Sequence, residues 1–314
     1  MKWIGRQQLV FVFFALSIAW SRLLAATFVY VADEVSRSVH RFDSTGTSLG
    51  PIASNIQATG LAQGPDGFLY ISEGQNNEVH RYNQSTGEFV DVFVSSSTGF
   101  KNDLVFGADG DLYVTDFQKD AVLRFDGSSG ASKGTFATVD EPNGLVFGAD
   151  GDLYVSTLGI THDIVRISAS SGNVVETFTG VFNPHKLTLG PDNNIYIATA
   201  GSAHIVRLQD GAISTFSSGH NISQAKDVEF TSDGDLLVMD RSADEVLLFD
   251  GQTGVYKETL ISGSPIEFGV GLFSPVPEPQ TYGFIVGVGV LTLACLRRAS
   301  LNARNRRESA TKHK

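Results

Sequence analysis

The chain has 314 residues, of which 42% are hydrophobic and 10% aromatic, which is enough to bury a substantial core. Its formal net charge is −11, but ten of the 23 basic residues and only one of the 34 acidic ones lie outside residues 27–280, so this body carries a net charge of −20. Such a body repels phosphate backbones, which argues against nucleic acid as a partner and suits solubility or the binding of divalent cations. The single cysteine, Cys295, lies outside the body, so no disulfide can stabilise it and a packed core or bound ions must do so.

Residues 1–26 have the pattern of a secretory signal peptide. Two basic residues open the segment, and an apolar run of twelve residues, 9–20, follows them. This run is too short for an ordinary membrane-spanning helix, and Ala25 and Ala26 supply small residues at the expected cleavage site. We therefore expect an exported protein; the alternative is an uncleaved N-terminal anchor.

One short sequence motif recurs six times between residues 27 and 274. Most copies follow a turn such as Asp109-Gly110, and these turns recur at intervals of 41–43 residues. Asp-Gly between two apolar runs is a strong hairpin signal, because glycine accepts a positive φ. The six copies are FVYVAD (28–33), FLYISE (68–73), DLYVTD (111–116), DLYVST (152–157), NIYIAT (194–199) and DLLVMD (235–240).

Each repeat unit contains four predicted strands, which is the signature of a propeller blade. The first copy, which follows Thr27, lacks the strand that precedes the others, and residues 269–273 resemble that missing strand. We therefore predict an all-β fold, a six-bladed β-propeller over residues 27–274, closed by strand exchange between its two ends. An open solenoid is the alternative. The repeat resembles NHL-repeat proteins, a likeness that implies this architecture and says little about function.

Polar side chains of different blades are expected to converge at one mouth of the central channel, where each innermost strand begins. In contrast, an arginine that occupies the same place in five blades (41, 81, 124, 166 and 207) is expected to have a structural role between blades. The candidate site residues at the mouth are Asn102, Asp103, Asn143, His185, Lys226 and Asp227.

Two segments of the mouth resemble the gluconolactonase and senescence-marker lactonase family. They are Lys101-Asn102-Asp103 and Pro142-Asn143-Gly144-Leu145. The resemblance implies that Asn102 and Asn143 are metal ligands for a divalent cation such as Ca²⁺, which prefers oxygen ligands. Two other ligand places of that family hold Thr59 and His185 here. The alternative for Asn143 is a structural role in a strand-entry turn.

His185 lies in NPHKL, which resembles the channel segment of the virginiamycin B lyases. This resemblance implies a histidine and glutamate set around a divalent metal, in which His185 would be a catalytic base or a ligand and Glu267 its candidate partner. The alternative is that His185 is a hydrogen-bonded packing residue.

Residues 275–314 form a tail with three features in a fixed order. Pro277, Glu278 and Pro279 come first, an apolar segment expected to form a transmembrane helix follows over residues 282–296, and a cluster of arginines ends it. This order resembles the PEP-CTERM sorting signal of Gram-negative bacteria, although Gln280 replaces the usual small residue. The resemblance implies transient insertion into the inner membrane and an exosortase-like membrane protease as a partner; the alternative is a plain C-terminal anchor.

Together these patterns favour an exported binding or structural module. We expect a monomer, anchored in the inner membrane as a precursor and located in the cell envelope or extracellular matrix when mature, with polysaccharide or protein as its partner. The alternative is a divalent-metal-dependent enzyme of the lactonase or lyase type, with its site at the central channel.

Overall fold

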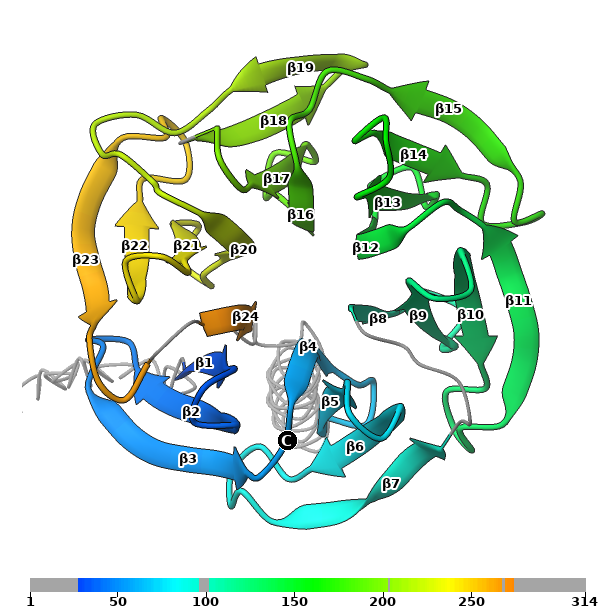
Figure 1. The fold of residues 1–314 in the computed structure, drawn as a ribbon, viewed down its shortest axis with the longest axis horizontal. Coiled ribbons are helices and arrows are strands. Elements are labelled where there is room, and N and C mark those ends of the chain that lie inside the picture. Colours follow the sequence, from blue (N-terminus) through cyan, green and yellow to red (C-terminus); the bar gives the residue numbers. More distant parts are fainter. Residues whose placement is uncertain (1–27, 96–101, 203, 267–268, 274–314) are drawn as a thin grey trace, which may run out of the picture.

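The computed structural model describes residues 28–95, 102–202, 204–266 and 269–273. Within these residues the chain forms β-strands only, arranged as a ring around a central axis (Figure 1). The strands are β1 (Phe28–Asp33), β2 (Ser38–Asp43), β3 (Ser48–Ser54), β4 (Ala58–Gln63), β5 (Leu69–Glu73), β6 (Glu78–Tyr82), β7 (Phe89–Ser95), β8 (Leu104–Phe106), β9 (Leu112–Asp116), β10 (Ala121–Phe125), β11 (Ser132–Thr138), β12 (Pro142–Phe147), β13 (Leu153–Thr157), β14 (Ile164–Ile167), β15 (Val174–Phe178), β16 (Pro184–Leu189), β17 (Ile195–Thr199), β18 (Ile205–Gln209), β19 (Ala212–Thr215), β20 (Ala225–Phe230), β21 (Leu236–Asp240), β22 (Glu245–Phe249), β23 (Tyr256–Ser262) and β24 (Gly269–Phe273).

The expected signal peptide and the sorting tail with Pro277, Glu278 and Pro279 lie outside the described residues. Over the part of the chain that is described, no helix is long and apolar enough to cross a membrane.

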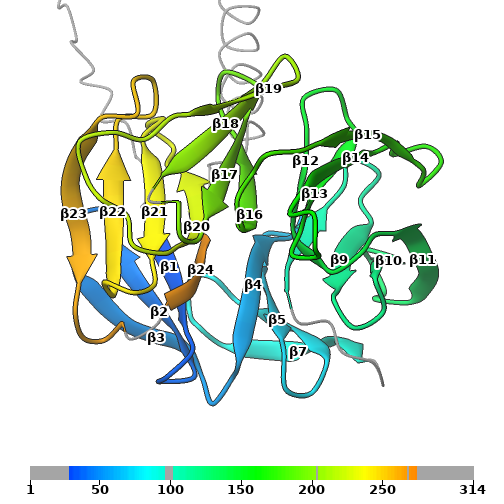
Figure 2. The same cartoon turned by 45° about the horizontal axis from the view of Figure 1, so that its top comes forward.

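Six four-stranded antiparallel sheets stand side by side around the axis, and the second view keeps the same order (Figure 2). The innermost strands are β4, β8, β12, β16, β20 and β24 (Figure 1). The blades are numbered 1 (β24, β1, β2, β3), 2 (β4–β7), 3 (β8–β11), 4 (β12–β15), 5 (β16–β19) and 6 (β20–β23). The six-bladed propeller predicted from the repeat is therefore confirmed.

Blade 1 is shared between the two ends of the ring. β24 pairs antiparallel with β1, with Val31 opposite Leu272, and so supplies the innermost strand that the first repeat lacks. Ring closure pairs the inner edge of β1, which removes a template for aggregation at this junction. The predicted closure is confirmed and the open solenoid is excluded.

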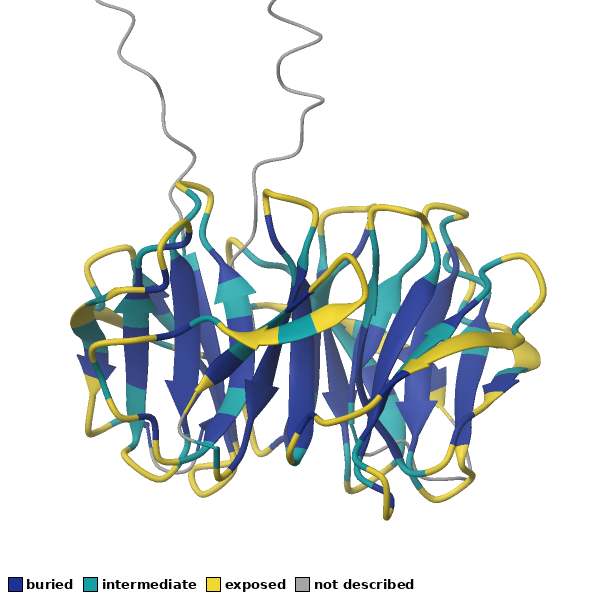
Figure 3. Ribbon diagram, turned by 90° about the horizontal axis from the view of Figure 1, so that it is seen from above, coloured by how far each residue is buried: buried dark blue, intermediate teal, exposed yellow. Residues whose placement is uncertain are grey.

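The second strand of every blade is buried along almost its whole length, as in β9 and β13 (Figure 3). A strand in the middle of a blade packs against a neighbouring blade on each of its faces, so both sets of alternating side chains are apolar. The core is accordingly divided into six clusters, one at each junction between adjacent blades. The centre of the ring is lined by the innermost strands instead of an apolar core.

The recurring arginines of blades 2, 3 and 4 have a structural role, as predicted, but their ion pairs lie within one blade and not between blades. In blade 3, the Tyr113 hydroxyl donates to Asp109 Oδ2 over 2.8 Å, and Arg124 Nη2 lies 2.7 Å from the same oxygen. Blades 2 and 4 repeat this arrangement around Asp66 and Asp150. The Asp-Gly turn, the middle strand and the third strand of a blade are thereby tied together at one end of the blade.

Candidate functional site

The strands around the channel are irregular where they begin. The ladder between β12 and β13 shifts register between Pro142 and Leu145, and that between β16 and β17 shifts between Pro184 and Leu187. Blades 2 and 6 have comparable shifts. A bulge frees residues from strict alternation and re-aims their side chains. Consecutive residues such as His185 and Lys186 can therefore both contact groups of other blades across the channel mouth.

Four of the predicted residues form a connected series around the mouth, which we call the mouth arc: Asn102, Asn143, His185 and Lys226. Asn102 Nδ2 donates to the carbonyl of Pro142 over 2.7 Å, which links blade 3 to blade 4. The amide of Asn143 lies 2.8 Å from His185 Nδ1, and Lys226 Nζ lies 3.1 Å from His185 Nε2. The arc thus runs without a break from blade 3 to blade 6.

Its hydrogen bonds define the state of His185. Burial, followed by the positive charges of Lys226, Arg241 and Lys186, lowers the pKa of His185 to about 3, so the imidazole is neutral. An ammonium can only donate, so Nε2 accepts from Lys226 and Nδ1 carries the hydrogen. The side-chain oxygen of Asn143 must then accept the hydrogen bond from Nδ1. This orientation is obtained by exchanging Oδ1 and Nδ2 of the Asn143 amide, two atoms that are nearly indistinguishable.

Lys226 is the second electrostatic feature of the arc. Its ammonium is half-buried, and among the described residues no carboxylate lies within ion-pair distance of it. Burial and then the positive charge of Arg241 lower the pKa of Lys226 to about 8, against a smaller opposing effect of Glu34. Arg241 itself pairs with Glu34 over 2.6 Å at the surface. The mouth is therefore locally positive on a strongly acidic protein.

One residue further along the strands lies a buried group of charges, which we call the channel cluster: Asp103, Lys186, Asp227 and Glu229. Lys186 Nζ lies 2.5 Å from Asp103 Oδ1, and both side chains are about nine-tenths buried. Burial alone would lower the pKa of Lys186, but Asp103, Asp227 and Glu229 outweigh it and the pKa is raised. Lys186 is thus a fixed ammonium surrounded by carboxyl groups.

Glu229 is the least obvious member of the cluster. Burial, followed by the negative charge of Asp227, raises the pKa of Glu229 to about 8, while a hydrogen bond with Thr188 opposes the shift. Its side chain keeps some contact with water in the channel, although protein surrounds it. At neutral pH the carboxyl is therefore mostly protonated, which lowers the net charge of the cluster.

Small residues and buried hydroxyls allow this arrangement. A Cβ on Gly144 would lie 2.5 Å from the carbonyl oxygen of His185, so only glycine lets β12 and β16 approach this closely. Thr115 donates to the carbonyl of Asn143 over 2.7 Å, and the Ser156 hydroxyl accepts from the Gly144 amide over 2.9 Å. The two hydroxyls satisfy backbone groups that the bulges leave without ladder partners.

The donor set does not fit a preformed divalent-cation site. Within the described ranges, no group of three or more His, Cys, Asp or Glu side chains is placed to hold a metal ion. The carboxylates of the channel already face the ammonium of Lys186, and the amides of Asn102 and Asn143 are engaged with Pro142 and His185. Glu267, the expected partner of His185, lies outside the described residues.

The structure therefore brings all six predicted residues to the channel, but it adds others that sequence reasoning missed. Glu229, Thr115 and Ser156 were not singled out, and neither was the Arg241–Glu34 pair. A polar residue inside an otherwise apolar repeat was the available signal for Thr115 and Ser156. Glu229 gave a weaker signal, because the corresponding places of other blades are occupied by residues of several kinds.

Comparisons with known proteins support the fold. No family model matches the chain, and no curated protein matches it. A solved nidogen/laminin complex contains a chain with a TM-score of 0.69 and 15% identity, covering 80% of this chain and 99% of that one. A protein of unknown function from Bacteroides caccae has a TM-score of 0.65 and 11% identity, covering 81% and 100%.

A catalytically inactive virginiamycin B lyase from Staphylococcus aureus, solved with quinupristin, is also similar. Its TM-score is 0.54 with 19% identity, covering 66% of this chain and 71% of that one. Identities this low establish a shared propeller fold alone. The structural neighbours therefore include both a lyase and a component of a protein complex.

The state of Glu229 makes stability depend on pH. Because the pKa of Glu229 rises from 4.5 to about 8 on folding, its contribution is fully present below pH 4.5 and is lost as the pH rises to 8. Glu229→Gln keeps a neutral group at every pH. Between pH 5 and 8 the variant should therefore gain stability relative to the native protein, on the order of 2 kcal/mol in urea unfolding.

Glu258→Gln on the exposed face of β23 is the matched control and should leave the pH profile of stability unchanged. An identical pH dependence in Glu229→Gln and the native protein would show that Glu229 is ionised in the fold at neutral pH.

Proposed function

We propose that this protein is an extracytoplasmic binding module whose channel mouth takes a ligand with a carboxylate. The observation that carries this proposal is the half-buried ammonium of Lys226, whose pKa is lowered to about 8 and which has no carboxylate partner among the described residues. A ligand carboxylate at Nζ would supply the missing counter-charge in a partly desolvated place, where a charge-assisted hydrogen bond is strong.

The surroundings of the mouth support a ligand with an apolar part. Ile160, on the loop between β13 and β14, is 101% exposed, and Phe182, on the loop before β16, is 61% exposed. Both loops lie at the end of the strands where His185 begins the channel. A carboxylate beside an apolar group is the chemistry of a peptide, so we favour a protein partner over an acidic polysaccharide.

The arrangement fits binding better than catalysis. His185 is neutral and already hydrogen-bonded on both nitrogens, and its pKa near 3 makes it a weak base. Deeper in the channel, Lys186 and Asp103 neutralise each other as an ion pair. These groups hold a fixed geometry without a vacant proton acceptor poised near neutral pH.

A second candidate is a lyase- or lactonase-type enzyme, and one observation favours it. A lysine with a pKa near 8 beside a histidine is the kind of perturbation that active sites often show. In such an enzyme neutral Lys226 would remove a proton from the substrate.

The two ends of the chain support delivery outside the cytoplasm. We propose that residues 1–26 direct export, and that the Pro277-Glu278-Pro279 tail holds the precursor at the inner membrane until an exosortase-like protease removes it. The mature ring would then reside in the cell envelope or matrix of a Gram-negative bacterium.

Binding at the mouth is tested with N-acetylleucine and its uncharged amide by isothermal titration calorimetry. The acid should bind and the amide should not, because only the acid offers a counter-charge to Lys226. Lys226→Met should weaken binding of the acid by about 10- to 100-fold, the range expected for loss of one charged hydrogen bond. Lys257→Met, which removes an exposed lysine on β23, should leave the affinity unchanged.

Equal affinity for the acid and the amide would contradict the proposal. If neither binds, but Ca²⁺ or Mn²⁺ does and Asn143→Ala abolishes that binding, the metal-dependent enzyme becomes the better account. Binding of glucuronate in place of N-acetylleucine would identify an acidic polysaccharide as the partner.

Processing of the tail is tested by the mass of the mature protein in its native host. The native chain should lose the segment that follows the Pro-Glu-Pro motif, whereas Glu278→Ala should retain it. Glu308→Ala, beyond the apolar segment, serves as the control and should be processed normally. A mature mass unaffected by Glu278→Ala would exclude the sorting-signal reading.

A further inference from the structure

A second candidate site lies at the opposite end of the strands, between blades 4 and 5. In blades 2, 3 and 5 the repeated tyrosine is covered edge-on by two phenylalanines, with ring centroids 4.7–5.2 Å apart. One phenylalanine comes from the outer part of the same blade and the other from the innermost strand of the next blade. These tyrosines, Tyr70, Tyr113 and Tyr196, are at most 1% exposed.

Blade 4 lacks both covering rings. Leu189 occupies the place on β16 where the innermost strands of blades 3, 4 and 6 have phenylalanine. In blades 2 and 3 the covering phenylalanine of the outer strand is an extra, bulged residue, whereas β15 has no bulge there and places Phe178 opposite Ile164 and Thr177 opposite Val165. Phe178 instead lies parallel to Tyr154 at a centroid distance of 6.2 Å. Tyr154 is consequently 9% exposed, more than any other tyrosine of the repeat.

The adjoining loop is also shortened. Residues 210–211 alone join β18 to β19, whereas residues 126–131 and 168–173 make the corresponding loops of blades 3 and 4. In those longer loops a glycine packs on the preceding blade so closely that a Cβ on Gly130 or Gly172 would lie 2.0 Å from a carbonyl oxygen. A Cβ on Gly211 would meet nothing nearer than Phe178, at 4.0 Å. The shortened loop therefore leaves the junction open.

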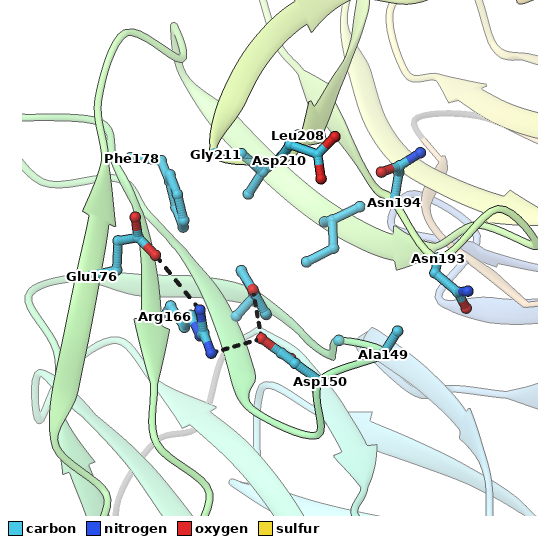
Figure 4. A pocket seen from close by; sticks show the side chains of 13 residues that line it. Ala149, Asp150, Arg166, Glu176, Phe178, Asn193, Asn194, Leu208, Asp210 and Gly211 are labelled. Atoms are coloured by element: carbon cyan, nitrogen blue, oxygen red, sulfur yellow. Dashed lines mark hydrogen bonds and ion pairs between the residues drawn. The ribbon is translucent and has the colours of Figure 1, made fainter.

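These three departures from the repeat leave a cavity of about 440 Å³ (Figure 4). Its size falls within the range of roughly 300–1,000 Å³ that small-molecule sites occupy. Arg166, Glu176 and Phe178 of blade 4 face Asp210, Asn193 and Asn194 of blade 5 across the opening. The lining turns end the innermost strands, so this cavity is separate from the channel mouth, where those strands begin.

The chemistry of the lining favours an uncharged ligand with many hydroxyl groups. Arg166 is paired with Asp150 at 3.0 Å, with Asp152 at 2.9 Å and more loosely with Glu176 at 3.6 Å, so its guanidinium is fully engaged and the carboxylates in excess are left to accept hydrogen bonds from hydroxyl groups. What remains is a mixture of donors and acceptors from amides and carboxylates. Tyr154 and Phe178 add an aromatic wall, and Leu208 adds an aliphatic one.

Charged ligands fit less well. An anion would meet Asp150, Glu176 and Asp210, and a cationic side chain would compete with Arg166, which already pairs with Asp150 and Glu176. A sugar ring offers hydroxyls that both donate and accept, and C–H faces that pack on aromatic rings. From the missing phenylalanines, the short loop and this lining, we infer that the blade 4–5 cavity binds a neutral sugar unit of a saccharide.

The test uses full-length protein and saturation-transfer NMR with maltose, cellobiose, mannobiose and di-N-acetylchitobiose as probes. At least one of these should bind. Leu189→Phe restores the ring that other blades carry and should fill the cavity and abolish binding, with no loss of thermal stability. Asp210→Asn, in an exposed turn at a φ of 50° that asparagine tolerates, should weaken binding about tenfold. Lys226→Met at the channel mouth should leave sugar binding unchanged.

Absence of binding for all four probes would overturn the inference, and so would binding that both Leu189→Phe and Asp210→Asn leave intact. Capture of a lysine-rich peptide, lost in Asp210→Asn, with none of the four sugars bound, would identify a protein-binding cavity and refute the sugar assignment. Sugar binding is measured independently of the proposed carboxylate site. If the channel mouth binds no carboxylate, the expected effects of Leu189→Phe and Asp210→Asn on sugar binding stay the same.

Discussion

The structure depends on one constraint: every blade is apolar on both faces, so each must pack between two neighbours. Only a closed ring satisfies this for all six blades, and β24 meets the requirement by pairing with β1. The almost fully buried middle strands and the six separate core clusters follow from the same condition. Closure also directs six innermost strands at one axis, so that residues distant in sequence meet in the channel.

Function is then expected where blades depart from their shared pattern. At the start of the innermost strands the repeat tolerates variation, and three blades place Asp103, Lys186 and Asp227 where the others place glycine. The glycine at position 144 lets Lys186 of blade 5 reach Asp103 of blade 3 past the strand between them. At the other end of the blades, Leu189 and the loop at 210–211 break the pattern and open a cavity.

The architecture was predictable because the same pattern of predicted strands occurs six times in the sequence. The apolar runs and their spacing agreed across the repeats, a turn signal preceded most of them, and the incomplete ends indicated closure. The mouth residues were predictable for the same reason, since one known position in a blade locates its counterparts in the others.

The interactions of these residues were not predictable from the sequence. The contact of Lys186 with Asp103 joins blades 3 and 5 and depends on the ring geometry, and the raised pKa of Glu229 depends on its burial and on the nearby charge of Asp227. Thr115 and Ser156 form hydrogen bonds with backbone groups that bulges leave without ladder partners, and no local sequence pattern predicts these bulges. The cavity between blades 4 and 5 could have been found by aligning the repeats, because Leu189 occupies the place where blades 3, 4 and 6 have phenylalanine.

The central claim is that Lys226 has no counter-charge among the residues that the structure describes, and that a ligand supplies one. The most direct measurement is the titration of the Lys226 side chain by ¹³C NMR in the free protein and in the presence of saturating N-acetylleucine. The account predicts a midpoint near pH 8 in the free protein and a rise toward the ordinary value of 10.5 when the carboxylate is bound. A midpoint near 10.5 in the free protein, or one that the ligand does not move, would contradict it.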